Sequence, residues 1–129
     1  MRHAVLLAFC FLVANVHAQG KTDLLRSQNL FRAKCAQCHS VACNRLGPKL
    51  EGLIGRRAGS VADFKNYTAE LKDSRIVWSE QAIDEFINDP GKMVPGTSMA
   101  GAGRVESANE RRDIIAHIRR QDRSIDLCL

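Results

Sequence analysis

The residues with the most evident chemistry form one short segment, Cys35-Ala36-Gln37-Cys38-His39. Two thiols separated by two residues can each form a thioether with one vinyl group of a heme, and an imidazole that follows directly can coordinate the iron. A dithiol redox pair, half of a zinc site and two unrelated core cysteines are the other interpretations of this spacing. The adjacent histidine favours covalent attachment of one heme through the two cysteines of this attachment motif.

The rest of the sequence gives little support to the zinc and dithiol interpretations. A zinc site needs about four ligands. Outside the attachment motif, the chain after residue 18 offers only Cys43, Cys128 and His117, which do not form a second close pair. No strand-rich, thioredoxin-like context surrounds the motif either. We therefore expect the cofactor to be heme c.

The first eighteen residues predict a cleaved secretory signal peptide. Arg2 and His3 form a short basic start, residues 4–14 are an unbroken apolar run, and Ala18 precedes the expected cleavage site. The apolar run is about half as long as the roughly 20 residues that a spanning helix needs. We expect residues 19–129 to form a single periplasmic domain with no transmembrane segment.

The charge of the chain is modestly basic, with a formal net charge of +5. No dense basic run with interleaved aromatic residues is present, which argues against nucleic acid as a partner. A small positive excess is typical of proteins that dock on an acidic protein partner.

Helices are the elements expected to position the attachment motif. Hydrophobic periodicity predicts a helix from about Asp23 to the motif, a short helix over residues 68–74, and a helix that Ser79 caps and Pro90 ends. Ser107 opens the last helix with a capping box. Residues 40–66 and 93–104 are expected to be loops. Because strand signals are nearly absent, the fold class is all-α.

Further motifs, taken with the attachment motif, resemble those of the class I cytochrome c family over residues 24–120. They follow in the family's order and are Arg45-Leu46-Gly47-Pro48-Lys49-Leu50-Glu51-Gly52-Leu53-Ile54-Gly55-Arg56, Tyr67-Thr68, Ile76-Val77-Trp78 and Pro95-Gly96-Thr97-Ser98-Met99. The resemblance implies the cytochrome c fold, with four to five helices wrapped around one covalently bound heme. It implies an electron-transfer protein, not an enzyme.

The same resemblance implies the two iron ligands. His39 would be the proximal ligand and Met99 would bind the opposite face of the iron. A soft thioether favours ferrous iron and raises the reduction potential. Met93 is the competitor, but it precedes the Pro-Gly turn, whereas Met99 stands where the family places its ligand.

Four other residues receive roles from the resemblance. Pro48 would offer its carbonyl to the imidazole of His39 and fix its tautomer. Trp78, Tyr67 and Arg56 would approach a heme propionate, because a buried charge needs paired donors. The alternatives are core packing for the two aromatic residues and solvated surface for the arginine. His117 stands at an aromatic position of the family, where we expect packing or surface.

Cys10 lies in the expected leader, and two further cysteines belong to the attachment motif. Two cysteines then remain. Cys43 and Cys128 are an even number in an oxidising compartment, which predicts a disulfide between them. Two free thiols or an intermolecular bridge are the alternatives.

The leading functional hypothesis is a monomeric periplasmic electron carrier. Its donor would be a dehydrogenase, and its acceptor an oxidase, a reductase or a photosynthetic centre. The basic residues expected to flank the heme edge and steer an acidic partner are Lys34, Lys49, Lys92 and Arg104. A small heme peroxidase or a gas or redox sensor, each with a displaceable Met99, is the alternative.

Overall fold

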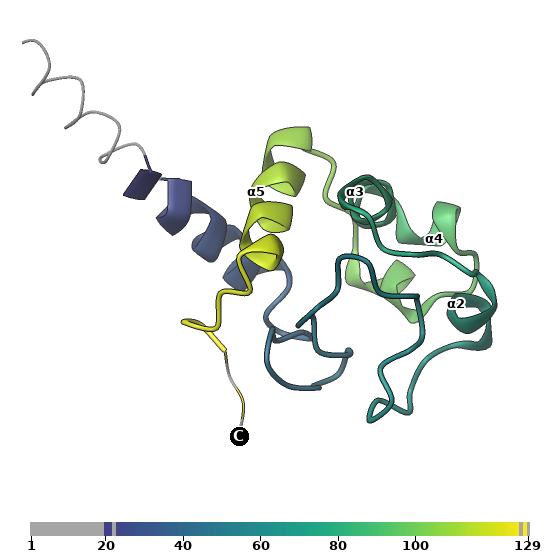
Figure 1. The fold of residues 1–129 in the computed structure, drawn as a ribbon. Coiled ribbons are helices and arrows are strands. Elements are labelled where there is room, and N and C mark those ends of the chain that lie inside the picture. The colour runs from purple at the N-terminus through teal and green to yellow at the C-terminus, as the bar shows by residue number, and fades with distance from the viewer. Residues whose placement is uncertain (1–19, 22, 127, 129) are drawn as a thin grey trace, which may run out of the picture.

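The structure, a computed structural model, describes residues 20–21, 23–126 and 128. The expected signal peptide lies outside these residues. An N-terminal helix ends at residue 34, directly before the attachment motif. The elements that follow are α2 (Ala69–Asp73), α3 (Glu80–Asn88), α4 (Pro90–Met93), the 3-10 helix η1 (Ser98–Ala102) and α5 (Ala108–Arg119) (Figure 1).

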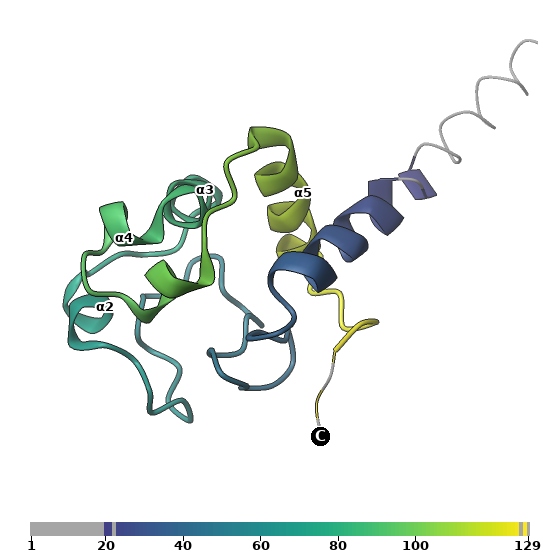
Figure 2. The same ribbon diagram turned by 180° about the vertical axis from the view of Figure 1, so that it is seen from behind.

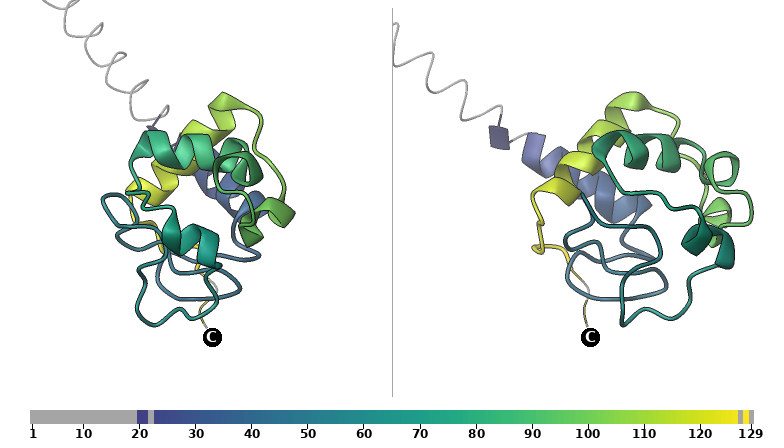
Figure 3. Two further views of the ribbon diagram at one scale, coloured as in Figure 1. Left: turned by 90° about the vertical axis from the view of Figure 1, so that its right-hand side faces the viewer. Right: turned by 45° about the vertical axis from the view of Figure 1, so that its right-hand side comes forward.

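The all-α prediction is confirmed. Within the described residues the only strand-like pairing is one isolated bridge between Arg57 and Val77. The predicted loop over residues 40–66 contains no helix, and in both views of Figure 3 it lies in the lower half of the molecule, below α5. None of the helices in this part of the chain is both long enough and apolar enough to cross a membrane.

Serine side chains begin two of the helices, as predicted. The hydroxyl of Ser79 accepts a hydrogen bond from the amide of Ala82 at 3.0 Å. The hydroxyl of Ser107 accepts one from the amide of Glu110 at 3.4 Å. The carboxylate of Glu110 forms an ion pair with Lys34 at 3.3 Å, so α5 is joined at its first turn to the N-terminal helix.

The prediction of an uninterrupted loop over residues 93–104 was wrong. Pro90 ends α3 as predicted, but it also begins α4. Proline is tolerated in the first turn of a helix because an N–H there would have no hydrogen-bond partner within the helix. The carboxylate of Asp89 accepts from the amide of Lys92 at 3.1 Å. The hydroxyl of Thr97 then accepts from the amide of Met99 at 3.4 Å and begins η1.

The N-terminal helix packs against α5, and α5 packs against α3 (Figure 2). The ring of Phe31 stacks on that of His117 with their centroids 4.3 Å apart. At the surface, Arg26 forms an ion pair with Asp113 at 2.8 Å. Burial of the two rings, both almost completely excluded from solvent, stabilises this contact more than the exposed ion pair does.

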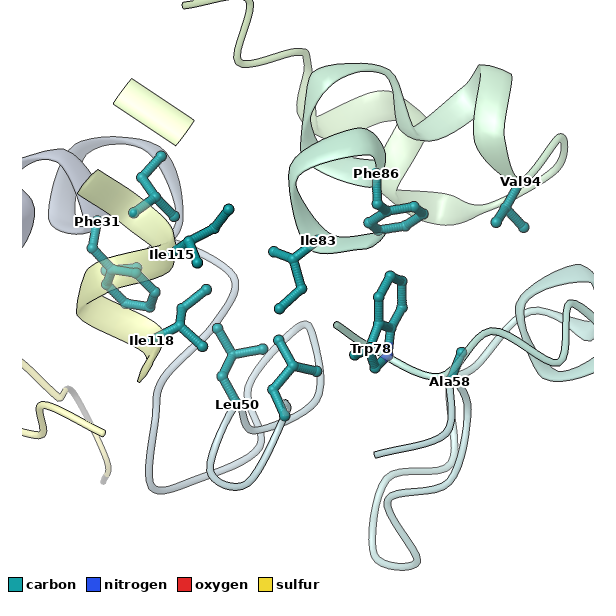
Figure 4. Packing of buried hydrophobic residues seen from close by; sticks show 12 residues of the cluster. Phe31, Leu50, Ala58, Trp78, Ile83, Phe86, Val94, Ile115 and Ile118 are labelled. Atoms are coloured by element: carbon teal, nitrogen blue, oxygen red, sulfur yellow. The ribbon is translucent and has the colours of Figure 1, made fainter. Parts of the chain in front are cut away.

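The hydrophobic core extends from this helix pair to Trp78. Figure 4 shows Ile83 between Trp78 on one side and Ile118 and Leu50 on the other. The rings of Trp78 and Phe86 are 5.0 Å apart. All five of these core residues also line a cavity, so the core of this small domain surrounds a space that a bound group could fill.

Candidate functional site

One cavity of about 280 Å³ lies at the centre of the candidate site. It collects residues from the end of the N-terminal helix, the long loop, α3, η1 and α5. Every residue predicted for the cofactor site lines it: Cys35, Cys38, His39, Pro48, Arg56, Tyr67, Trp78 and Met99. The competing Met93 packs on the core but is not among the lining residues.

The attachment motif forms a tight turn that continues the N-terminal helix. The amides of Cys38 and His39 both donate to the carbonyl of Cys35, at 3.1 and 2.9 Å. Burial raises the pKa of the Cys35 thiol to about 12, because a thiolate would lose its solvation. A neutral thioether at this position would carry no such penalty.

The imidazole of His39 is prepared to bind a metal. Its Nδ1 donates to the carbonyl oxygen of Pro48 at 2.8 Å. Since a carbonyl can only accept, the proton is on Nδ1 and the lone pair is on Nε2. Burial lowers the pKa of His39, although the bond to Pro48 offsets part of the shift. At neutral pH the ring is therefore in the neutral form that binds metals.

Gly47 allows the His39 ring to lie directly on the loop backbone. A Cβ at this position would lie 2.6 Å from Nε2 and 2.7 Å from Nδ1 of the ring. Glycine is therefore required before Pro48 because the His39 ring comes very close to the backbone there. The sequence alone shows the glycine but not this reason for it.

Gly47→Ala is expected to destabilise the protein by about 1–3 kcal/mol, because the new methyl group must displace the ring. Denaturant unfolding of the heme-loaded protein measures this. Gly101→Ala is the matched control, since a Cβ there meets no atom within 4 Å. Equal stability of the two variants would refute the close packing of His39 on the loop.

Arg56 is a half-buried cation without a carboxylate partner among the described residues. Its guanidinium donates to the carbonyls of Glu51 at 2.7 Å and Lys49 at 2.9 Å. Burial lowers the pKa of Arg56. It is the only lining residue with a permanent charge, so an anionic group in the cavity would have a natural counter-charge.

Trp78 and Tyr67 present further donors at the same cavity. No described residue accepts from the indole N–H of Trp78, although the side chain is buried. The hydroxyl of Tyr67 accepts from the amide of Val61 at 3.4 Å, which leaves its own proton available. An apolar cavity with two thiols, a neutral imidazole, a thioether and unpaired donors fits a heme with its propionates.

The comparisons with known proteins agree with this chemistry. A cytochrome c of Gibberella zeae is 40% identical over 100 residues, which cover 75% of this chain and 92% of the relative. A cytochrome c of Arabidopsis thaliana is 38% identical over 109 residues, which cover 82% and 94%. The chain belongs to the cytochrome c family. No family model matches the sequence.

As a cytochrome c, the chain is an electron-transfer protein that carries one covalently attached heme c. A third relative, cytochrome c 2.1 of Caenorhabditis elegans, is 37% identical over 98 residues, which cover 74% of this chain and 86% of the relative. The resemblance inferred from the motifs and the all-helical fold are thus both confirmed.

The other two cysteines of this cytochrome that the structure describes do not line the cavity. Cys43 and Cys128 are joined by a disulfide with their Cα atoms 5.9 Å apart. Cys35 and Cys38 are free. Among the described residues, no group of three or more His, Cys, Asp or Glu side chains could hold a metal ion. Because Cys43 and Cys128 are bonded to each other, they are not available as the additional ligands that the zinc interpretation requires.

His117 is packed in the core, which is one of the two settings that the sequence predicts for it. The side chain has no solvent exposure, and neither ring nitrogen has a hydrogen-bond partner in the described structure. Burial lowers its pKa, an effect that the carboxylate of Asp122, 3.7 Å from Nδ1, offsets in part. Arg120 lowers the pKa further, and Asp126 raises it.

This cytochrome should therefore lose stability in acid at His117. The unfolded chain takes up a proton near the ordinary histidine pKa of about 6.5, whereas the folded chain does so only at lower pH. The contribution of neutral His117 to the free energy of unfolding is fully present above pH about 6.5 and is lost as the pH falls through the folded pKa.

His117→Phe keeps the stacking on Phe31 and should raise the free energy of unfolding by about 1 kcal/mol at pH 7. The free energy of unfolding of this variant should also decline less steeply in acid. Denaturant titrations at several pH values measure both effects, and parallel pH profiles would contradict the assignment.

Proposed function

We propose that this chain is a periplasmic electron carrier whose heme is attached through Cys35 and Cys38 and whose iron is bound by His39 and Met99. The observation that supports it is the shared cavity: two free cysteines and a neutral imidazole from one turn, and a thioether from the distant helix η1, line one apolar space. The heme supplies one-electron chemistry between ferrous and ferric iron.

The chain's own residues tune and protect that chemistry. Pro48 holds the His39 ring in the tautomer that leaves Nε2 free, which also raises the basicity of the ring. The apolar lining excludes water from the centre of the cavity. Arg56 and Trp78 would donate to the propionates of a bound heme, so that their charge would not be left unpaired. Because His39 and Met99 would both hold the iron, no position on it would be open for a substrate.

The periplasmic location rests on the N-terminal sequence and on the disulfide, which is typical of oxidising compartments. The relatives named above come from eukaryotes. Expression of the full chain in a bacterium that matures c-type cytochromes tests the location. We expect a heme-stained product in the periplasmic fraction that begins at residue 19, and deletion of residues 1–18 should abolish it. A heme protein that retains its leader in the cytoplasm would contradict the proposal.

The partners we propose are redox proteins: a dehydrogenase as donor, and an oxidase, a reductase or a photosynthetic centre as acceptor. The basic residues expected to steer them are largely neutralised. Carboxylates pair with three of the four, in Lys34–Glu110 at 3.3 Å, Lys49–Asp63 at 3.3 Å and Arg104–Asp89 at 3.5 Å. The exposed residues that line the cavity are uncharged: Leu46, Asn66, Ser98 and Ala102.

We therefore expect apolar contact at Leu46, whose side chain is 78% exposed, to contribute more to docking than charge does. Leu46→Gln should slow second-order electron transfer by about fivefold, the loss of about 1 kcal/mol of apolar contact. The rate of the parent should fall only weakly with added salt. Leu25→Gln, at an exposed leucine that does not line the cavity, is the control. Stopped-flow kinetics that show a steep salt dependence and no effect of Leu46→Gln would favour charge steering.

A further inference from the structure

The chain continues beyond α5 as a segment that lies against the long loop of the heme site. Figures 1 and 2 show it leaving the end of α5 and running beside the loop that follows the N-terminal helix. We call residues 121–126 and Cys128 the C-terminal strap. We propose that this strap positions the iron ligand His39, with Asp126 as its main positioning residue. The inference rests on the proposed function, in which His39 binds the iron.

Asp126 makes the most direct contact. Its two carboxylate oxygens accept hydrogen bonds from the consecutive amides of Val41, at 2.8 Å, and Ala42, at 2.9 Å. Hydrogen bonds to an ionised acceptor are about twice as strong as those between neutral groups. Val41 has no solvent exposure and lies two residues after His39, so the carboxylate fixes the backbone directly after the ligand.

The held segment is hydrogen-bonded to the part of the loop that follows Pro48. The carbonyl of Ser40 accepts from the amide of Leu50 at 3.0 Å, and the carbonyl of Val41 accepts from the amide of Glu51 at 2.8 Å. The carbonyl of Pro48, just before these amides, holds Nδ1 of the His39 ring. A continuous series of hydrogen bonds therefore leads from Asp126 to the ligand.

The strap also holds the loop at the residues that follow Pro48. The side-chain oxygen of Gln121 accepts from the amide of Gly52 at 2.8 Å. Arg123 forms an ion pair with Glu51. The disulfide from Cys128 to Cys43 then ties the strap to the residue that follows the segment held by Asp126. The strap thus holds the long loop on both sides of Pro48.

This arrangement should keep the hydrogen bond between His39 and Pro48 closed. Outer hydrogen bonds of this kind fix the orientation of a ligand histidine and tune its basicity. If the hydrogen bonds between Asp126 and the loop are lost, the loop opens more often and exposes the Nδ1 proton of His39 to water. Exchange of that proton through local opening of the loop reports on the positioning, whereas core amides that exchange only when the whole protein unfolds report on global stability and serve as the internal reference.

The test uses the full heme-loaded protein in its ferrous state, with the exchange rate of the His39 Nδ1 proton measured by NMR. Asp126→Asn replaces one acceptor oxygen with a donor that faces a backbone N–H, and should speed the exchange at least tenfold. Asp113→Asn is the matched control, because it breaks the surface pair with Arg26 without touching the loop. It should change the rate by less than twofold.

A second route removes the covalent anchor and leaves Asp126 in place. Cys43→Ser combined with Cys128→Ser should also speed the exchange, and it keeps the test decisive if Asp126→Asn folds poorly. Exchange within twofold of the parent in every variant that folds would overturn the positioning role. Absence of a His39–iron bond in the parent spectrum would instead refute the proposed function, so the two failures are distinguishable.

Discussion

Met99→Ala is expected to abolish the weak far-red sulfur-to-iron absorption band of the ferric protein and to lower its reduction potential by on the order of 100 mV or more, within the roughly 0.8 V range that axial ligands set. The reason is the loss of a soft, neutral ligand that favours the ferrous state. Absorption spectra in both oxidation states and a potentiometric titration measure the two effects.

Met93→Ala is the matched control for this result. Met93 and Met99 both pack against the core, but only Met99 lines the cavity. The control should therefore keep the band and most of the potential. If Met93→Ala loses the band instead, the ligand assignment is wrong. A parent protein whose ferric heme is five-coordinate or binds water would support the peroxidase or sensor alternative.

Replacement of Cys43 and Cys128 by serine has the largest expected effect on stability. The disulfide closes a loop with a sequence separation of 85 residues. Loss of such a cross-link lowers the free energy of unfolding by about 4.5 kcal/mol in the chain-entropy model. Denaturant unfolding of the heme-loaded parent and of the double variant measures the difference.

The same variant separates stabilisation by the disulfide from stabilisation by the rest of the strap. Reduced parent protein should match the double serine variant, because Asp126 and Gln121 keep their hydrogen bonds to the loop. Two titratable thiols in the unreduced, denatured parent would show that the bond does not form in solution. A change in stability below about 1 kcal/mol would contradict the entropic account.

The sequence predicted the features that short-range chemistry determines. The spacing from Cys35 to His39 implies both thioether bonds and a ligand within a single turn, and the structure forms that turn. Ser79 and Ser107 precede their helices because a hydroxyl can accept from an amide three residues later. Met99 was preferred to Met93 through the family resemblance, and the cavity separates the two residues in the same way.

The features that the sequence did not predict depend on contacts between distant residues. No local pattern distinguishes a free Lys49 from one paired with Asp63, so the expected basic surface was overestimated. For His117 the sequence left packing and surface both open, because the choice depends on Phe31, which lies on another helix. The carboxylate of Asp126 finds its two amides on a loop near the start of the domain, and nothing near residue 126 indicates that contact.

Every role proposed for the residues of the cavity depends on one heme bound covalently to this chain at residues 35–39. The most direct test is the mass of the exported protein after full denaturation and extraction with acid and organic solvent, followed by mapping of its peptides. We predict one heme per chain, retained on the peptide that contains Cys35, Cys38 and His39. A denatured chain with the mass of the unmodified polypeptide, or a heme on any other peptide, would contradict the account.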